Sequence, residues 1–170
     1  QDQINALIDL YHSGQIAKVA QACQELLQSY PQSLIVLNVL GAALAGQGQL
    51  QQAVRVFDQI IQLQPDDAQA HSNRGNALQE LGQLEAAVNS YDQAIQTQPD
   101  DAQAYYNRGN ALQELGQLEA AVNGYDQAIE LQPDYTQAYS NRGSAFQKLG
   151  QPEAAVASYN QAIELQPDDA

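Results

Sequence analysis

The sequence is poor in several residue types that mark particular classes of protein. It contains no Trp, no Met and one cysteine, Cys23, and a lone cysteine excludes an internal disulfide and a multi-cysteine metal site. Positive charge is also scarce, because 6 Lys and Arg residues stand against 20 Asp and Glu residues, for a net charge of −14. This balance argues against binding a nucleic-acid backbone or an anionic membrane surface. We therefore predict neither a nucleic-acid nor a membrane partner.

Long apolar runs are missing as well. The longest, residues 34–46, spans 13 residues and includes Asn38, whereas a membrane-spanning helix needs about 20. The chain does not open with a basic segment and an apolar core, so no secretion signal is predicted. A cytoplasmic location is the resulting expectation.

Instead, the chain carries a repeat of 34 residues. Residues 68–101 and 102–135 match at 28 of 34 positions, and the flanking residues keep glycine and proline at the same offsets. Such a fixed period indicates an array of identical structural units. We predict one array over residues 1–170, with copies at residues 1–33, 34–67, 68–101, 102–135 and 136–169.

Each copy is predicted to form two helices. Aspartates precede the first helix and can cap it: Asp66, Asp67, Asp100, Asp101 and Asp134. Glycine able to adopt positive φ ends that helix at Gly82, Gly116 and Gly150. In the third copy the second helix is predicted from about residue 84 to residue 97, where apolar residues form one stripe and Pro99 follows.

The small, aromatic and proline positions resemble those of the tetratricopeptide repeat: Gly75, Gly82, Ala87, Tyr91, Ala94 and Pro99. The resemblance covers all five copies, although the first departs most, with Leu7 and Cys23 at places where glycine and an aromatic residue are expected. A buried, inert thiol is the simplest interpretation of Cys23. The resemblance implies an all-α, right-handed α-solenoid whose first helices line a concave groove.

In this family the second, fifth, sixth, ninth, twelfth and thirteenth places of a copy line the groove. The sixth place carries asparagine in three copies, which is similar to the repeats of O-linked N-acetylglucosamine transferases, where an asparagine ladder holds a peptide backbone. An Asn amide can donate to a peptide C=O and accept from its N–H. The alternative is that Asn suits a tight helix–helix seam. The candidate peptide-binding residues are Asn73, Asn107, Asn141, Asn76, Asn110, Gln69, Gln103, Gln137 and Tyr106.

The first two copies place apolar residues in the groove instead: Ile4, Ile8, Tyr11, Ile35 and Val39. They could hold an apolar peptide, a partner helix or a second copy of the chain, or they could pack on one another. Lys148 is the only cation at a groove place, and Glu80 and Glu114 hold the equivalent places. An acidic peptide tail should therefore be repelled.

Catalytic chemistry is poorly represented. There is no phosphate-loop or G-x-G-x-x-G motif, and His12 and His71 lie in different copies with no motif around them. Packing is the simpler role for His71. We predict a non-catalytic module without cofactor or metal that binds a protein or peptide in its groove.

Two alternative functions stay open. The chain stops at the first position of a sixth copy, so we expect it to be part of a longer chain, and a glycosyltransferase or sulfotransferase domain could follow. It could instead be a self-assembling scaffold. The helix predicted at residues 152–165 would then pair with another chain through an uncovered apolar stripe of Ala155, Val156, Tyr159, Ala162 and Ile163.

Arginine occupies a place near the predicted helix seam in the last three copies, at Arg74, Arg108 and Arg142. A partly buried cation there needs an acidic partner. Pairing with the Asp 18 residues later fails for Arg142, which would meet Asn160. Pairing with the Asp 16 residues earlier succeeds for all three. We therefore predict ion pairs between consecutive copies: Arg74–Asp58, Arg108–Asp92 and Arg142–Asp126.

Overall fold

The computed structural model describes residue 7, residue 10 and residues 15–166. Over these residues all regular secondary structure is α-helical. The helices are α2 (Ile16–Ser29), α3 (Leu34–Gly46), α4 (Leu50–Leu63), α5 (Ala68–Glu80), α6 (Leu84–Thr97), α7 (Ala102–Glu114), α8 (Leu118–Leu131), α9 (Thr136–Lys148) and α10 (Pro152–Leu165). The predicted pattern of paired helices is confirmed, and α6 has the bounds expected from the sequence.

Glycines make the tight turns inside the helix pairs. Gly48, Gly82, Gly116 and Gly150 have φ of 70°, 71°, 76° and 71°, a region that glycine enters without steric cost. After Gly116, the N–H of Gln117 donates to the carbonyl oxygen of Leu112 at 2.9 Å. This bond satisfies a carbonyl at the end of α7 and turns the chain into α8. The prediction that these glycines end the first helices is confirmed.

Helix capping follows the prediction in two copies and departs from it in the last. The carboxylate of Asp67 accepts from the N–H of Ala70, and that of Asp101 accepts from the N–H groups of Gln103 and Ala104. In α9, however, the N-cap residue is Tyr135, and its side chain makes no cap bond. The expectation that Asp134 caps α9 was wrong, because the residue aligned with Asp67 and Asp101 is Tyr135.

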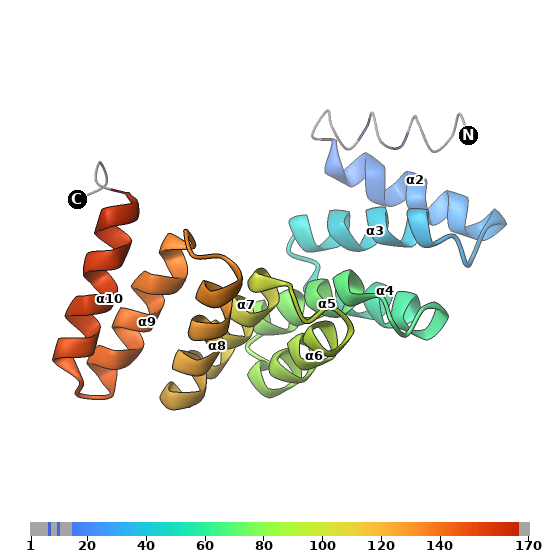
Figure 1. Ribbon diagram of the computed structural model, residues 1–170. Coiled ribbons are helices and arrows are strands. Elements are labelled where there is room, and N and C mark those ends of the chain that lie inside the picture. The colour runs from blue at the N-terminus through green and yellow to red at the C-terminus, as the bar shows by residue number, and fades with distance from the viewer. Residues whose placement is uncertain (1–6, 8–9, 11–14, 167–170) are drawn as a thin grey trace. The chain divides into compact units, whose positions relative to one another are not determined.

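The chain divides into two compact units, Gln1–Gly82 and Gln83–Ala170, here called the N-terminal unit and the C-terminal unit. In the N-terminal unit α2 packs on α3, α3 on α4 and α4 on α5. In the C-terminal unit each helix from α6 to α10 packs on the next, and α7 also contacts α9. Figure 1 shows these neighbours side by side within each unit. The single array of five copies stays a prediction.

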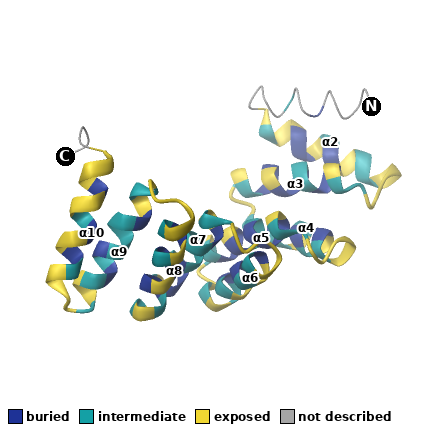
Figure 2. Ribbon diagram, viewed as in Figure 1, coloured by how far each residue is buried: buried dark blue, intermediate teal, exposed yellow. Residues whose placement is uncertain are grey.

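An aromatic ring against a glycine forms the centre of a helix pair in each unit. Phe57 and Tyr125 are among the largest fully buried side chains. A Cβ added at Gly41 would lie 2.5 Å from Cε1 of Phe57, and one added at Gly109 would lie 2.7 Å from Cε1 of Tyr125. Glycine therefore lets the ring approach the first helix directly. Figure 2 shows the buried residues on the faces where paired helices meet.

Two expectations about single residues are confirmed. Cys23 is fully buried, and burial raises the pKa of its thiol to about 11, so that the reactive thiolate is scarce at neutral pH. His71 is also buried, and its Nε2 lies 2.9 Å from the carbonyl oxygen of Pro65. Both side chains belong to the packing of the N-terminal unit.

Candidate functional site

The N-terminal unit contains a pocket of about 270 Å³ between α3 and α5. Six of its eight lining residues stand at the sixth, ninth, twelfth or thirteenth places, where the repeat predicts a groove. We call this pocket the open groove site. It is lined by Ala42, Ala45, Gly46, Phe57, Asn73, Asn76, Ala77 and Glu80.

The open groove site is apolar on the α3 side and polar on the α5 side. Small side chains on α3 leave the space open, and the buried ring of Phe57 reaches it from α4. On α5, Asn73 is half-buried and its Oδ1 accepts from Nε2 of Gln69 at 3.0 Å, whereas Glu80 is exposed. The site therefore combines apolar walls with amide groups and one carboxylate.

The corresponding place in the C-terminal unit, between α7 and α9, is occupied by a hydrogen-bond network. The hydroxyl of Tyr125 can donate to Oδ1 of Asn110 at 2.9 Å or to Oε1 of Gln113 at 3.2 Å. Nδ2 of Asn141 donates to the same Oδ1 at 2.8 Å and to the hydroxyl of Tyr106 at 3.0 Å. We call these five residues the networked site. Their polar groups satisfy one another across the two helices.

Two tyrosines extend this network along α7. The rings of Tyr106 and Tyr135 lie 4.9 Å apart, and the hydroxyl of Tyr135 donates to Oε1 of Gln103 at 2.7 Å. Gln103 in turn donates from Nε2 to Oδ1 of Asn107 at 2.8 Å. Burial raises the pKa of Tyr135 to about 12, and burial with the neighbouring Tyr106 raises the pKa of Tyr125 further. Both hydroxyls therefore stay protonated at neutral pH.

The structure thus brings together most of the predicted polar groove residues, but in different ways. Asn73 and Asn76 line the open groove site, whereas Asn110, Asn141 and Tyr106 join the networked site. Gln69 and Gln103 each donate to the asparagine one turn later, and Gln137 is exposed. The alternative that Asn serves a helix–helix seam describes Asn141, whose amide joins α9 to α7.

The predicted apolar groove is described in part. Ile35 is 56% exposed and Val39 is half-buried against the core of the N-terminal unit. Ile4, Ile8 and Tyr11 lie outside the described residues. The described part therefore offers Ile35 as an exposed apolar side chain.

The three predicted ion pairs between copies are present. Nε of Arg74 lies 2.6 Å from Oδ1 of Asp58, and Nε of Arg108 lies 2.6 Å from Oδ1 of Asp92. Nη1 of Arg142 is at the same distance from Oδ1 of Asp126. In each pair the guanidinium is more buried than the carboxylate. The 16-residue register inferred from the edges of the array is confirmed.

Comparison with known families agrees with this geometry. A family profile described as "TPR repeat" matches residues 41–82, 75–116 and 109–150, and one described as "Tetratricopeptide repeat" matches residues 136–169. The chain belongs to the tetratricopeptide-repeat family. The matched stretch runs from Gly41 to residue 169, and the first copy, which departs most from the pattern, lies before it.

Solved structures give the same fold for these tetratricopeptide repeats. A crystal structure of MamA is 23% identical with a TM-score of 0.91, covering 95% of this chain and 94% of that one. MamA from Desulfovibrio magneticus RS-1 is 24% identical with a TM-score of 0.92, covering 100% and 99%. YrrB, described as a TPR protein with an unusual peptide-binding site, is 19% identical with a TM-score of 0.83, covering 98% and 86%. The all-α solenoid class is confirmed. No curated protein sequence matches the chain.

Several residues of the tetratricopeptide groove were missed by sequence reasoning. The small side chains of Ala45 and Gly46 open the groove, and Phe57 reaches it from a second helix. Their signal in the sequence is a contrast with the other copies, which carry Gln at the place of Ala45 and Glu or Lys at that of Gly46. Tyr135 was expected to be a capping position rather than a ring against Tyr106.

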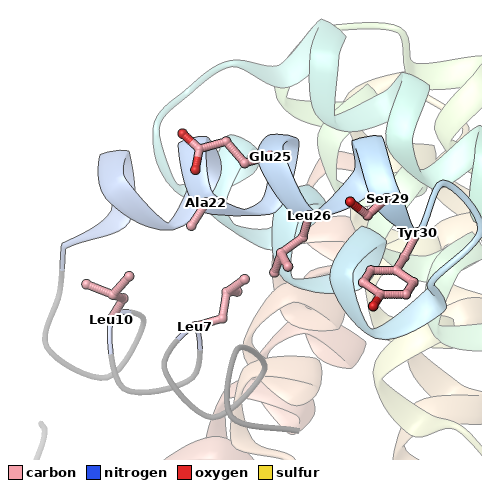
Figure 3. Close-up of a pocket in the computed structure, with 7 residues that line it drawn as sticks. All are labelled: Leu7, Leu10, Ala22, Glu25, Leu26, Ser29 and Tyr30. Atoms are coloured by element: carbon pink, nitrogen blue, oxygen red, sulfur yellow. The ribbon is translucent and has the colours of Figure 1, made fainter.

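A second pocket, of about 370 Å³, lies at the start of the described chain. It is lined by Leu7, Leu10, Ala22, Glu25, Leu26, Ser29 and Tyr30. Figure 3 shows Leu7 and Leu26 pointing toward one another, while Glu25 points away from them. These residues do not stand at groove places of the tetratricopeptide pattern, except for Leu10 and Leu7 on the first helix of the copy, so the pocket is a separate feature.

The last tetratricopeptide helix, α10, is less exposed than the sequence predicted. Ala155 and Ala162 are buried and Tyr159 is half-buried, because this stripe packs on α9, where Tyr159 meets Gly143. The expectation that all five stripe residues are uncovered was wrong. Val156 and Ile163 are the members that stay exposed, at 56% and 50%.

Other kinds of site were searched over the described part of the chain. No group of three or more His, Cys, Asp or Glu side chains there is arranged to hold a metal ion. In the same residues no helix combines the length and apolar character needed to cross a bilayer. The groove between first helices is therefore the site on which a functional proposal is built.

Proposed function

We propose that this chain is a non-catalytic interaction module that binds an extended peptide of a partner protein in the groove of its first helices. The observation that carries the proposal is the open groove site between α3 and α5, where Asn73 and Asn76 stand beside an unfilled apolar space. Each amide offers both a donor and an acceptor to a peptide backbone. Membership of a family of peptide-binding repeats supports the same interpretation.

The expected affinity is modest. A net hydrogen bond contributes about 0.5–1.5 kcal/mol, and binding must offset the ordering of the peptide. A short peptide should therefore bind in the roughly micromolar to millimolar range. Such weak contacts suit a module that gains affinity from several copies acting on one partner.

The test is a selection of random dodecapeptides on the immobilised chain, followed by titration of selected peptides against wild type and Asn73→Ala. The exposed Asn123, on α8 and away from the groove places, supplies the control Asn123→Ala. We expect Asn73→Ala to weaken binding at least three-fold, as the loss of one or two backbone hydrogen bonds would, with no change for Asn123→Ala.

Asn107 and Asn141 test how far the peptide follows the first helices. Their double alanine variant should also weaken a ligand that spans both units, after correction for any loss of stability measured by urea unfolding. Unchanged affinity for Asn73→Ala and for the double variant would remove the asparagine ladder. Selection of no peptide above background would contradict the proposed function itself.

Self-association through α10 is a second candidate, favoured by the exposure of Val156 and Ile163. At the equivalent place of the fourth copy, Val122 is 8% exposed, so the repeat normally covers this position. A substitution of Val156 and Ile163 by Glu should lower the sedimentation-average mass at high protein concentration if this face binds another chain. An unchanged mass for wild type across concentrations would contradict it.

The remaining expectations stay predictions from the sequence. These are the cytoplasmic location, the lack of nucleic-acid and membrane partners, and the lack of a cofactor. The possible role as recognition arm of a larger enzyme is tested by the sequence of the parent chain.

A further inference from the structure

We infer that the open groove site selects a basic side chain, Lys or Arg, from the peptide that the groove binds. This inference rests on the proposed function, because it names the residue type that an already bound peptide places in this pocket. The argument comes from the size of the pocket, from its walls, and from its charge compared with the equivalent place in the C-terminal unit.

The size of the pocket fits one long side chain. Its volume is about 270 Å³, which is at the lower limit of the roughly 300–1,000 Å³ of pockets that hold drug-sized molecules. It is also far larger than the roughly 30 Å³ that one water molecule occupies in the liquid. A long, unbranched side chain entering from a groove-bound backbone would fill it.

The walls favour a side chain that is apolar along its length and polar at its end. Ala42, Ala45 and the ring of Phe57 give apolar surface on one side, and the amides of Asn73 and Asn76 lie on the other. Lys and Arg have this character, because an aliphatic stem can pack on apolar surface while the charged head stays hydrated. A purely aliphatic side chain would leave the polar wall unused.

The charge of the site decides between a basic and a neutral head group. Glu80 is the ionisable residue among those that line the pocket, and it is exposed at the thirteenth place of α5. The whole chain has a net charge of −14, so the surrounding potential also favours a cation. An acidic side chain in this pocket would meet a carboxylate with no lining cation to offset it.

The repeat itself provides an internal comparison. Two periods later, the place of Glu80 is held by Lys148, and the places of Ala42, Ala45 and Phe57 are held by Asn110, Gln113 and Tyr125. There the chain supplies its own cation and fills the groove with the networked site. In the open groove site both the filling groups and the cation are absent from the described lining residues, and a ligand side chain can supply both.

The experiment uses the full chain and four blocked heptapeptides, Ser-Thr-Val-X-Val-Thr-Ser, in which X is Lys, Arg, norleucine or Glu. Flanking β-branched residues favour an extended backbone. Titrations are followed by ¹H–¹⁵N correlation spectra at about 0.15 M salt, where the Debye length of about 8 Å suppresses long-range attraction. Norleucine keeps an aliphatic stem without the charge, so its comparison with Lys isolates the head group.

We expect the Lys and Arg peptides to bind about two- to five-fold more tightly than the norleucine peptide, and the Glu peptide to bind most weakly. Glu80→Gln should abolish the preference for Lys over norleucine. The matched control Glu114→Gln, at the same place one copy later, should leave it unchanged. Ala45→Gln, which introduces the residue that the other copies carry, should fill the pocket and weaken all four peptides.

The outcomes separate the inference from the proposed function. Equal binding of the four peptides, or equal effects of Glu80→Gln and Glu114→Gln, overturns the basic pocket and leaves peptide binding standing. Shifts confined to the C-terminal unit also overturn it. If none of the four peptides shifts any groove resonance at millimolar concentration, both the inference and the proposed function are contradicted.

Discussion

The open groove site and the networked site occupy the same places in the repeat, two periods apart, and differ in chemistry. In the N-terminal unit, small residues on α3 and the ring of Phe57 leave space beside Asn73. In the C-terminal unit, Asn110, Gln113 and the hydroxyl of Tyr125 fill the equivalent place and bind Asn141. The backbone frame is shared, and the difference lies in side-chain size and in one phenolic oxygen.

This difference teaches that a groove asparagine can take two roles within one array. Where the facing first helix carries Ala, the asparagine lines a space that a ligand can enter. Where it carries Asn and Gln, the amide joins consecutive first helices and stiffens the array. Peptide binding and groove shape are thus divided between copies, which is why substitutions at equivalent places should have unequal effects.

The largest expected difference concerns the glycines that meet the aromatic rings. Gly109→Ala should lower the free energy of unfolding by about 2 kcal/mol, because overpacking costs about 1–3 kcal/mol and hydrogen bonds at its hydroxyl hold Tyr125 in place. Gly41→Ala should cost less, about 1 kcal/mol, because the ring of Phe57 borders open space into which it can shift. Urea unfolding of the full chain measures both.

The geometry makes this a demanding test. The added Cβ would lie closer to the ring at Gly41, at 2.5 Å, than at Gly109, at 2.7 Å. A rigid molecule would therefore suffer more from Gly41→Ala. If that variant proves the more damaging, the open groove site does not relieve the ring, and the proposed contrast in plasticity fails.

The second contrast exchanges the aromatic residues. Tyr125→Phe removes the donor shared by Asn110 and Gln113 and should destabilise the chain by about 1 kcal/mol, the usual net value of one hydrogen bond. Phe57→Tyr adds the same hydroxyl where Ala42 and Ala45 offer no polar side chain. The pocket still gives that hydroxyl access to water, so its effect on stability should be within about 0.5 kcal/mol.

The same exchange also reports on binding. Because the new hydroxyl of Phe57→Tyr would enter the open groove site, it should reduce the affinity for a groove peptide, whereas Tyr125→Phe should not. The measurement is the peptide titration described above. Equal loss of stability from both exchanges would mean that the networked hydroxyl contributes nothing beyond packing.

Much of the fold could be predicted from the sequence because the repeat period multiplies weak signals. One glycine before a turn is ambiguous, but Gly82, Gly116 and Gly150 recur at a fixed offset and all adopt positive φ. The ion pairs were predictable for a related reason. At the edges of the array the acid and the base appear or vanish together, which selects the 16-residue register.

The details of the groove could not be predicted in the same way. Repeat logic treats Asn73 and Asn141 as equivalent, although their surroundings are set by residues on the preceding first helix and on the facing second helix. The cap at Asp134 failed because one substitution, to Tyr135, changed the role of the place. The stripe of α10 was misjudged because periodicity gives the apolar residues of a helix but not which neighbour covers each of them.

The smallest expected effect concerns the ion pairs, which are alike in both units. Asp58→Asn and Asp126→Asn should each lower the free energy of unfolding by about 0.3–1 kcal/mol, since the carboxylates are 42% exposed and exposed pairs contribute little. Removing a negative charge also relieves repulsion in a chain of net charge −14, so the exposed Asp100 provides the control Asp100→Asn. The quantity that matters is the difference from this control.

That difference should be similar for the two pairs at low salt and should shrink in about 1 M salt, where the Debye length falls to about 3 Å. Arg142 also donates from Nε to Oγ of Ser158 at 3.1 Å, so its guanidinium keeps a partner after Asp126→Asn. The loss at Asp126 should therefore not exceed the loss at Asp58. If Asp58→Asn and Asp126→Asn both match the control, the pairs set the angle between copies without adding stability, and the ion-pair contribution to unfolding is refuted.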